Sequence, residues 1–402
     1  MPRLVRTPLT WLIYVQLGLY AYFLYSFGPV VGFLRDEQGT SNAQASLHTS
    51  ALAVGAMVGG ALFPWFSQRF SRGTAMWAAL CAVALAVLGF VTLPSQFPIT
   101  LSLSVLVAFG GMWVISCVVV TLSQMHGASG PAAISEANAL AVAAGFVAPL
   151  VVGWAVDMGW GWRAGLVVLI GLIGVVALVA WRMRMMALPA GEVQVAAAAQ
   201  PRAALPRAYW LAWMMMVMTG TVEIVMSLWA ALVLREEAGF SAGAAAATVS
   251  AILAGMLIGR TAGARIALYV DTIPLYLGAL VVSLAGFVVF WLSGSAWLAI
   301  VGLFVVGLGN AMHYPLAIAL AITVAPGQAD RAAGVSSYGM GLSFGVGPFL
   351  LGLLADEVGA HTALLLIPLF LAGAAVLALG VRSSASTPKI GDRPAEVAQQ
   401  MA

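Results

Sequence analysis

A single acid, Glu223, lies near the middle of a long apolar segment, residues 207–234. At that depth of a membrane-spanning helix an ionised carboxylate is costly, so it must face a polar cavity, pair with a cation or carry a proton. Because burial favours the protonated form, a carboxyl group that alternates between dry and wet surroundings can take up and release protons. We therefore predict that Glu223 is a proton-coupling residue. The competing interpretation is a structural hydrogen bond between helices.

A second polar group lies in the apolar segment 296–323, where Asn310, His313 and Tyr314 are close neighbours. Histidine titrates near neutral pH and can relay protons or hydrogen-bond a solute. We predict His313 as a second proton-coupling residue, with Asn310 and Tyr314 as substrate-binding residues. A histidine whose hydrogen bonds are satisfied inside the helix bundle is the alternative.

Arg260 lies toward the end of the apolar segment 243–264. A guanidinium group grips a carboxylate with two parallel hydrogen bonds, which makes Arg260 a candidate substrate-binding residue for an anion. A long cationic side chain can also reach the membrane surface while its stem stays in apolar surroundings. Both interpretations remain open. Glu223 and Arg260 could also neutralise each other when no solute is bound.

Aromatic residues recur along segment 8–34, where Tyr14, Tyr22 and Tyr25 fall on one helical face. Trp113 lies in segment 98–122. We predict that Tyr22, Tyr25 and Trp113 bind the apolar part of a substrate.

Methionines crowd the segment that carries Glu223, and clustered thioethers can bind Cu(I). Methionine is also an ordinary packing residue in helices, so a metal path is the minor interpretation. The sequence has no phosphate-binding glycine loop after a strand and no nucleophile triad. We predict no enzyme activity, no resident metal and no cofactor. The methionines in question are Met214, Met215, Met216, Met218 and Met226.

The composition is that of a membrane protein. Of the 402 residues, 62% are hydrophobic and 8% charged, whereas soluble domains carry about a quarter charged residues. Long apolar segments recur along the whole chain, and each can cross about 30 Å of hydrocarbon. We predict an all-α transmembrane protein with twelve spans, at residues 8–34, 44–66, 74–93, 98–122, 133–156, 162–182, 207–234, 243–264, 272–293, 296–323, 332–355 and 361–381.

The basic residues predict the orientation of these spans. Fourteen of them fall on the side of the termini and three on the other side, a strong positive-inside bias. We expect both termini in the cytoplasm and the chain in the inner (cytoplasmic) membrane. The three residues on the outer side are Arg35, Arg163 and Arg235.

One half of the chain repeats in the other. Residues 33–45 (FLRDEQGTSNAQA) match 233–245 (VLREEAGFSAGAA), and residues 148–157 (APLVVGWAVD) match 347–356 (GPFLLGLLAD). The near-constant offset indicates two parallel six-helix repeats. We predict an N-terminal half at 1–182, a cytoplasmic linker at 183–206, a C-terminal half at 207–381 and a disordered tail at 382–402.

The loop between the second and third spans, residues 60–73 (GALFPWFSQRFSRG), resembles the cytoplasmic G-x-x-x-D-R-x-G-R signature of the major facilitator superfamily. Gln68 stands where that family has an acid. Gly145, Pro149 and Gly153, and Gly347-Pro348 with Gly352, resemble its glycine–proline pattern. The resemblance covers essentially the full chain. It implies the major facilitator fold, with a central cavity lined by spans one, four, seven and ten that opens alternately to each side.

Together these features predict a secondary active transporter that moves a small organic solute, anionic or zwitterionic, by proton-coupled symport. Its expected partners are the solute, protons and the lipid bilayer; we expect a monomer and no nucleic-acid partner. The leading alternative is proton-driven efflux of amphipathic or cationic drugs. Uptake of Cu(I) or another metal, and a non-transporting sensor, are lesser alternatives.

Overall fold

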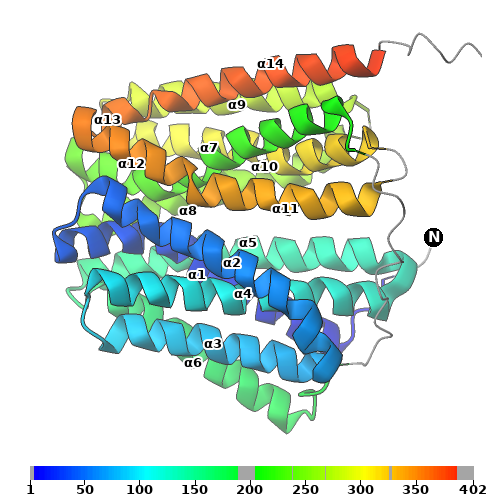
Figure 1. Cartoon of the computed structure of the whole chain (residues 1–402). Coiled ribbons are helices and arrows are strands. Elements are labelled where there is room, and N and C mark those ends of the chain that lie inside the picture. Colours follow the sequence, from blue (N-terminus) through cyan, green and yellow to red (C-terminus); the bar gives the residue numbers. More distant parts are fainter. Residues whose placement is uncertain (1–3, 189–203, 238, 268, 326–327, 387–402) are drawn as a thin grey trace, which may run out of the picture.

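The computed structural model describes residues 4–188, 204–237, 239–267, 269–325 and 328–386, and all regular structure in these ranges is helical (Figure 1). Within these ranges, twelve helices or helix pairs are long and apolar enough to cross a membrane, as predicted. The helices are α1 (Pro8–Gln38), α2 (Asn42–Arg69), α3 (Arg72–Thr92), α4 (Phe97–His126), η1 (Gly127–Ser129), α5 (Gly130–Asp157), α6 (Trp162–Arg182), α7 (Arg207–Glu237), α8 (Ala242–Ile266), α9 (Thr272–Trp291), α10 (Ala296–Thr323), α11 (Ala329–Gly345), α12 (Gly347–Val358), α13 (Ala360–Ala363) and α14 (Leu366–Ser386).

Two predicted spans are each broken into two helices. The eleventh divides between α11 and α12 at Val346, just before Pro348. Proline lacks an N–H and its ring clashes with the preceding turn, which explains the break. The twelfth divides between α13 and α14, where Pro368 lies in the first turn of α14. Helix α14 also continues to Ser386, into the segment predicted to be a disordered tail; the rest of that tail and most of the predicted linker lie outside the described residues.

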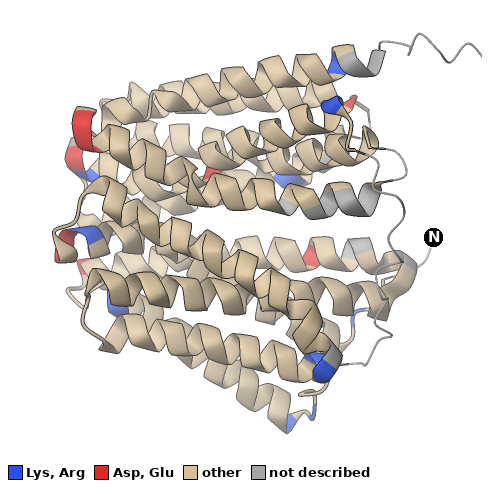
Figure 2. Cartoon of the chain, viewed as in Figure 1, with Lys and Arg blue, Asp and Glu red and all other residues tan. Residues whose placement is uncertain are grey.

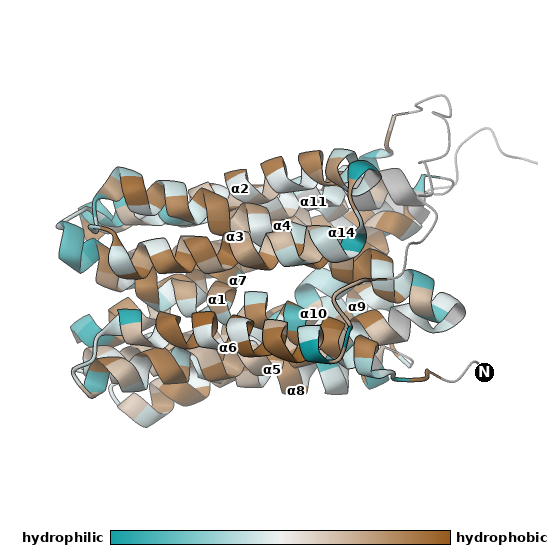
Figure 3. Cartoon of the chain, turned by 90° about the horizontal axis from the view of Figure 1, so that it is seen from below, coloured by the Kyte–Doolittle hydropathy of each residue, from teal (hydrophilic) through white to brown (hydrophobic). Residues whose placement is uncertain are grey.

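Charged residues gather at the two ends of the bundle, and apolar residues dominate the length between them (Figures 2 and 3). The N-terminus and the end of α14 lie at the same end (Figure 1). We call this the proximal end and the opposite one the distal end. This distribution fits a bundle whose middle lies in hydrocarbon and whose ends lie in water.

The internal repeat reappears in the packing of each half. Gly55 of α2 lies against α4, where an added Cβ would be 2.2 Å from the Val105 carbonyl oxygen. Gly255 of α8 lies against α10 in the same way, 2.0 Å from the Phe304 carbonyl oxygen. Only glycine permits so close an approach of two helices. The two contacts are related by the offset that relates the sequence motifs, so both halves are built on one pattern.

The two halves meet through α1 against α7, α2 against α11 and α12, and α5 against α8. Hydrogen bonds and ion pairs between the halves gather in the distal part of these helices, from Ser50–Gly345 and Ser250–Phe146 outward to Asp36–Arg235. Toward the proximal end, α2 and α11 diverge (Figure 1). Among the described residues, the hydrogen bonds and ion pairs that join the halves are therefore concentrated at the distal end.

Candidate functional site

A small cavity lies between the halves about midway along α7. Its volume is about 50 Å³, room for one or two water-sized groups. Its polar lining comes from Glu223 and Ser227 of α7, Tyr25 of α1 and Thr49 of α2. The apolar lining includes Leu24, Phe27, Leu52 and Phe344. The cavity thus has a mostly apolar wall and a single acid.

The helical repeat of α7 brings Glu223 to this cavity. Glu223 and Ser227 are four residues apart, so they lie on the same face of the helix. The distal limit of the cavity is a close approach of α1 and α7: an added Cβ on Gly28 would lie 2.6 Å from the Ser227 carbonyl oxygen. Glu223 therefore lies just on the proximal side of this close contact between α1 and α7.

The carboxylate of Glu223 has no direct partner among the described residues. Within the part of the chain that the structure describes, its carboxylate forms no hydrogen bond or ion pair. The cation that acts on it electrostatically is Arg260 of α8, whose own Nε is buried without a hydrogen-bond partner. Counted from the distal ends of α7 and α8, Arg260 lies about 6 Å nearer the proximal end than Glu223. Two opposite charges thus lie near each other without touching.

Tyr25 completes this group from the other half. Its ring packs on α5 at Gly145, where an added Cβ would be 2.2 Å from the tyrosine Cδ2. The hydroxyl interacts electrostatically with both Glu223 and Arg260. Of the predicted site residues, the structure brings together Tyr25, Glu223 and Arg260, and we call these three the charge cluster.

Sequence comparison decides the family. The family model of the Major Facilitator Superfamily matches residues 13–337 and 225–399, most of the chain. The chain belongs to the major facilitator superfamily. It is therefore a secondary transporter and not an enzyme. No curated protein matches the sequence.

Solved structures agree on the fold. A bacterial homolog of the human lysosomal transporter Spinster, in an inward-facing and occupied conformation, has a TM-score of 0.74 at 15% identity, covering 93% of this chain and 95% of that one. A peptide transporter in complex with sulfate gives 0.73 at 14%, covering 94% of each chain. The nucleoside transporter NupG gives 0.69 at 13%, covering 95% and 100%. At these identities the likeness establishes the fold alone.

Two of the predicted aromatic residues lie inside the N-terminal half of the transporter. The hydroxyl of Tyr22 donates to the Gly165 carbonyl of α6 over 2.8 Å. Trp113 donates from Nε1 to the Gly59 carbonyl over 2.8 Å and packs against Phe66, with the two rings tilted at 42°. Both side chains pack helices together in this conformation, and their contact with a solute stays a prediction.

Asn310 and His313 lie inside the C-terminal half of the transporter, on the side of α10 that faces α9. Ser283 of α9 donates to Asn310 Oδ1 over 3.1 Å and lies 3.4 Å from His313 Nε2. Both side chains are 1% exposed. Gly309 permits this contact, because an added Cβ would meet Ser283 Oγ at 2.2 Å. His313 is thus separate from the charge cluster, and its role in proton movement stays a prediction.

Tyr314 differs from its neighbours because it is 41% exposed. Successive helical residues point about 100° apart, so the Tyr314 side chain leaves α10 in a different direction from that of His313. The α7 methionines also point in several directions: Met216 packs on Gly339 of α11 and Met218 on Gly373 of α14. Among the described residues, no three His, Cys, Asp or Glu side chains gather as a metal site.

Sequence reasoning missed Thr49 and Phe344 as cavity residues. Nothing in their types marks them, because threonine and phenylalanine are common in membrane helices. They line the cavity because of where the two halves meet. Ser227 is different, because its helical spacing in segment 207–234 predicts that it shares a face with Glu223.

Proposed function

We propose that the transporter carries a small organic solute bearing a carboxylate, together with a proton, through the space between its halves. The observation that carries this proposal is the unpartnered Glu223 carboxylate at the cavity, near the equally unpartnered Arg260 Nε. Intramembrane charges are costly, and those that remain are usually functional.

The chemistry follows from charge balance. In the empty transporter, ionised Glu223 offsets the charge of Arg260 without a direct ion pair. A proton on Glu223 removes that offset and leaves the guanidinium free to bind a carboxylate with two hydrogen bonds. The loaded cluster then carries the same net charge as the empty one. The transporter can therefore change conformation, whether empty or loaded, without moving an uncompensated charge through the bilayer.

The placement of basic residues supports a cytoplasmic proximal end. The three distal arginines all form ion pairs with acids. The described basic residues at the proximal end are more numerous: Arg6, Arg69, Arg72, Arg182, Arg184, Arg207, Arg265 and Arg382. By the positive-inside rule the proximal end faces the cytoplasm, and the distal contacts between the halves lie on the outer side.

Uptake into proteoliposomes tests the proposal. With the outside acidic, a panel of labelled small organic acids and zwitterions should include at least one solute that accumulates above equilibrium. Glu223→Gln should abolish this accumulation, because the amide cannot carry a proton. Glu357→Gln is the matched control, since Glu357 is exposed at the distal end. The proposal would be overturned if the solute accumulates equally without the pH gradient and accumulates equally in Glu223→Gln.

A second candidate is proton-driven efflux of cationic amphipathic compounds. It is favoured by the apolar side chains of Leu24, Phe27 and Leu52 around a lone acid. In that case overexpression raises resistance to such compounds, Glu223→Gln removes the resistance, and Arg260→Ala leaves it unchanged.

A further inference from the structure

The two sequence motifs that repeat between the halves both lie at the distal end, and transport as proposed above uses neither. One repeat ends in Asp157 in the N-terminal half and Asp356 in the C-terminal half. The other contains Arg35-Asp36 and Arg235-Glu236. In the structure each motif contacts the opposite half.

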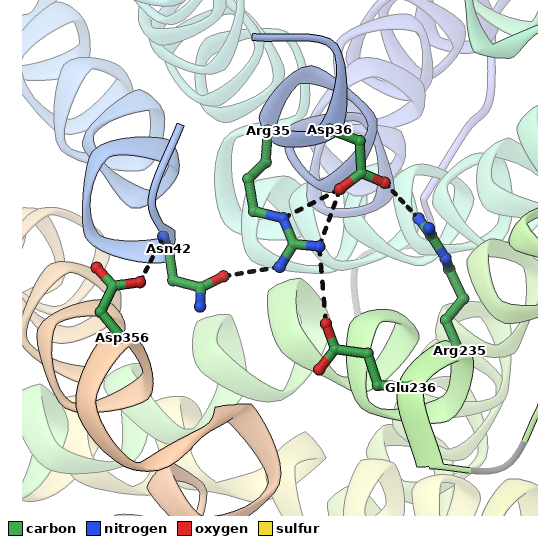
Figure 4. A network of polar contacts seen from close by, with 6 residues as sticks. All are labelled: Arg35, Asp36, Asn42, Arg235, Glu236 and Asp356. Carbon is green, nitrogen blue, oxygen red and sulfur yellow. Dashed lines mark hydrogen bonds and ion pairs between the residues drawn. The ribbon is translucent and has the colours of Figure 1, made fainter. Parts of the chain in front are cut away.

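Asp356, near the end of α12, accepts hydrogen bonds from two backbone amides at the start of α2. The distances are 2.7 Å to the backbone nitrogen of Asn42 and 3.1 Å to that of Ala43. Figure 4 shows the hydrogen bond to Asn42. A helix start leaves such amides without partners inside the helix, and a carboxylate also suits its dipole. Gly352 lets α12 approach, because an added Cβ would lie 2.8 Å from the Ala43 Cα.

Asp157 makes the corresponding contact from the N-terminal half to the C-terminal half. From the end of α5 its Oδ1 accepts a hydrogen bond of 2.8 Å from Ser241, the residue before α8. Gly153 approaches Gly243 of α8 so closely that an added Cβ would lie 2.3 Å from its carbonyl oxygen. Asp157, Gly153 and Ser241 match Asp356, Gly352 and Ser41 through the internal repeat. We call these two contacts the distal caps.

Crossed ion pairs lie between the distal caps. Arg235 binds Asp36 at 2.7 Å, and Arg35 lies 3.7 Å from Glu236 (Figure 4). Arg35 also donates to the Asn42 side chain over 2.8 Å, which links the ion pairs to the cap on α2. These ion pairs are partly exposed, and such pairs contribute little individually.

We propose that Asp157 and Asp356 are positioning residues that hold the distal gate of the transporter closed through one duplicated contact. Each distal cap joins a carboxylate of one half to a helix start of the other, so it exists only while the halves meet distally. A contact made in one of two conformations shifts the equilibrium toward that conformation. Asp356 binds two amides and Asp157 a single hydroxyl, so Asp356 holds the gate more strongly.

Distances between spin labels test this proposal. One label pair spans the distal end at the exposed residues Met158 and Leu292, and a second spans the proximal end at Phe70 and Tyr269. All labels are introduced as cysteines after Cys81 and Cys117 are replaced. The measurement is made on the full chain in lipid nanodiscs, and needs no solute.

Asp356→Asn is expected to raise the ratio of distal-open to distal-closed transporter about fivefold, with a longer distal and a shorter proximal distance. Asp157→Asn is expected to raise it about twofold. Glu357→Gln, on the same turn as Asp356, is the matched control, because Glu357 forms no hydrogen bond or ion pair with described residues.

Equal distance distributions for Asp356→Asn and Glu357→Gln would overturn the proposal, provided that both proteins elute as single species. A longer distal distance without a shorter proximal one would also overturn it, because that pattern is local fraying rather than a movement of the halves. Neither outcome bears on proton coupling, since the experiment contains no solute and no pH gradient.

Discussion

At the scale of single residues, the transporter places two opposite charges inside the membrane and keeps them apart. Glu223 lines the cavity, and Arg260 lies near it without forming an ion pair. A direct pair would satisfy both groups and leave neither for a ligand. Their separation is what favours a transport role over a structural one.

Arg260 distinguishes a carboxylate ligand from a snorkelling residue. If the guanidinium fork binds the solute, Arg260→Lys keeps the charge but loses the bidentate geometry, and KM should rise about tenfold. Arg260→Ala should raise KM further. If Arg260 only snorkels, lysine performs equally well and KM stays unchanged. Initial uptake rates in proteoliposomes measure the difference, with Arg265→Lys, the exposed arginine of the same helix, as the control.

At the scale of elements, the distal closure depends on close helix contacts between the halves. Gly28 of α1 lies against α7 at the Ser227 carbonyl, whereas Gly32, one turn further along, has nothing within 4 Å of an added Cβ. The two glycines lie on the same helix, and only Gly28 is in close contact with α7.

Gly28→Ala should therefore force α1 and α7 apart, and Gly32→Ala should not. With spin labels on Met158→Cys and Leu292→Cys, we expect Gly28→Ala to lengthen the distance between the labels. We also expect it to lower the transport rate. Gly32→Ala should leave both quantities unchanged. If Gly28→Ala leaves the distances and the rate as they were, the α1–α7 contact does not determine closure.

The helices could be predicted from the sequence because an apolar run is a local feature. The break at Val346 was missed, since proline is often tolerated within membrane helices. Pro29, Pro149 and Pro315 lie inside continuous helices of this chain. Glu223 stood out as an intramembrane acid. The direction of Tyr22 could not be predicted, because it depends on how α1 packs against α6.

At the scale of the whole molecule, the internal repeat predicted two equivalent halves but not their mutual contacts. The sequence showed that Asp157 and Asp356 correspond. It could not show that each caps a helix of the opposite half, because that contact joins residues such as Asn42 and Asp356 from distant parts of the chain.

The orientation of the molecule is tested by thiol labelling in intact cells. Met158→Cys at the distal end should react with a membrane-impermeant maleimide from outside. Tyr269→Cys at the proximal end, where the tyrosine is 88% exposed, should react only after the cells are permeabilised. The reverse pattern would contradict the cytoplasmic assignment of the proximal end.

Proton movement driven by the solute tests the central claim most directly. A pH-sensitive dye trapped inside proteoliposomes reports protons that enter when the transported solute is added outside, with no pH gradient imposed. We predict acidification of the lumen in proportion to solute uptake, and its loss in Glu223→Gln. Solute entry without any change in luminal pH, or equal acidification by Glu223→Gln, would contradict proton coupling through Glu223.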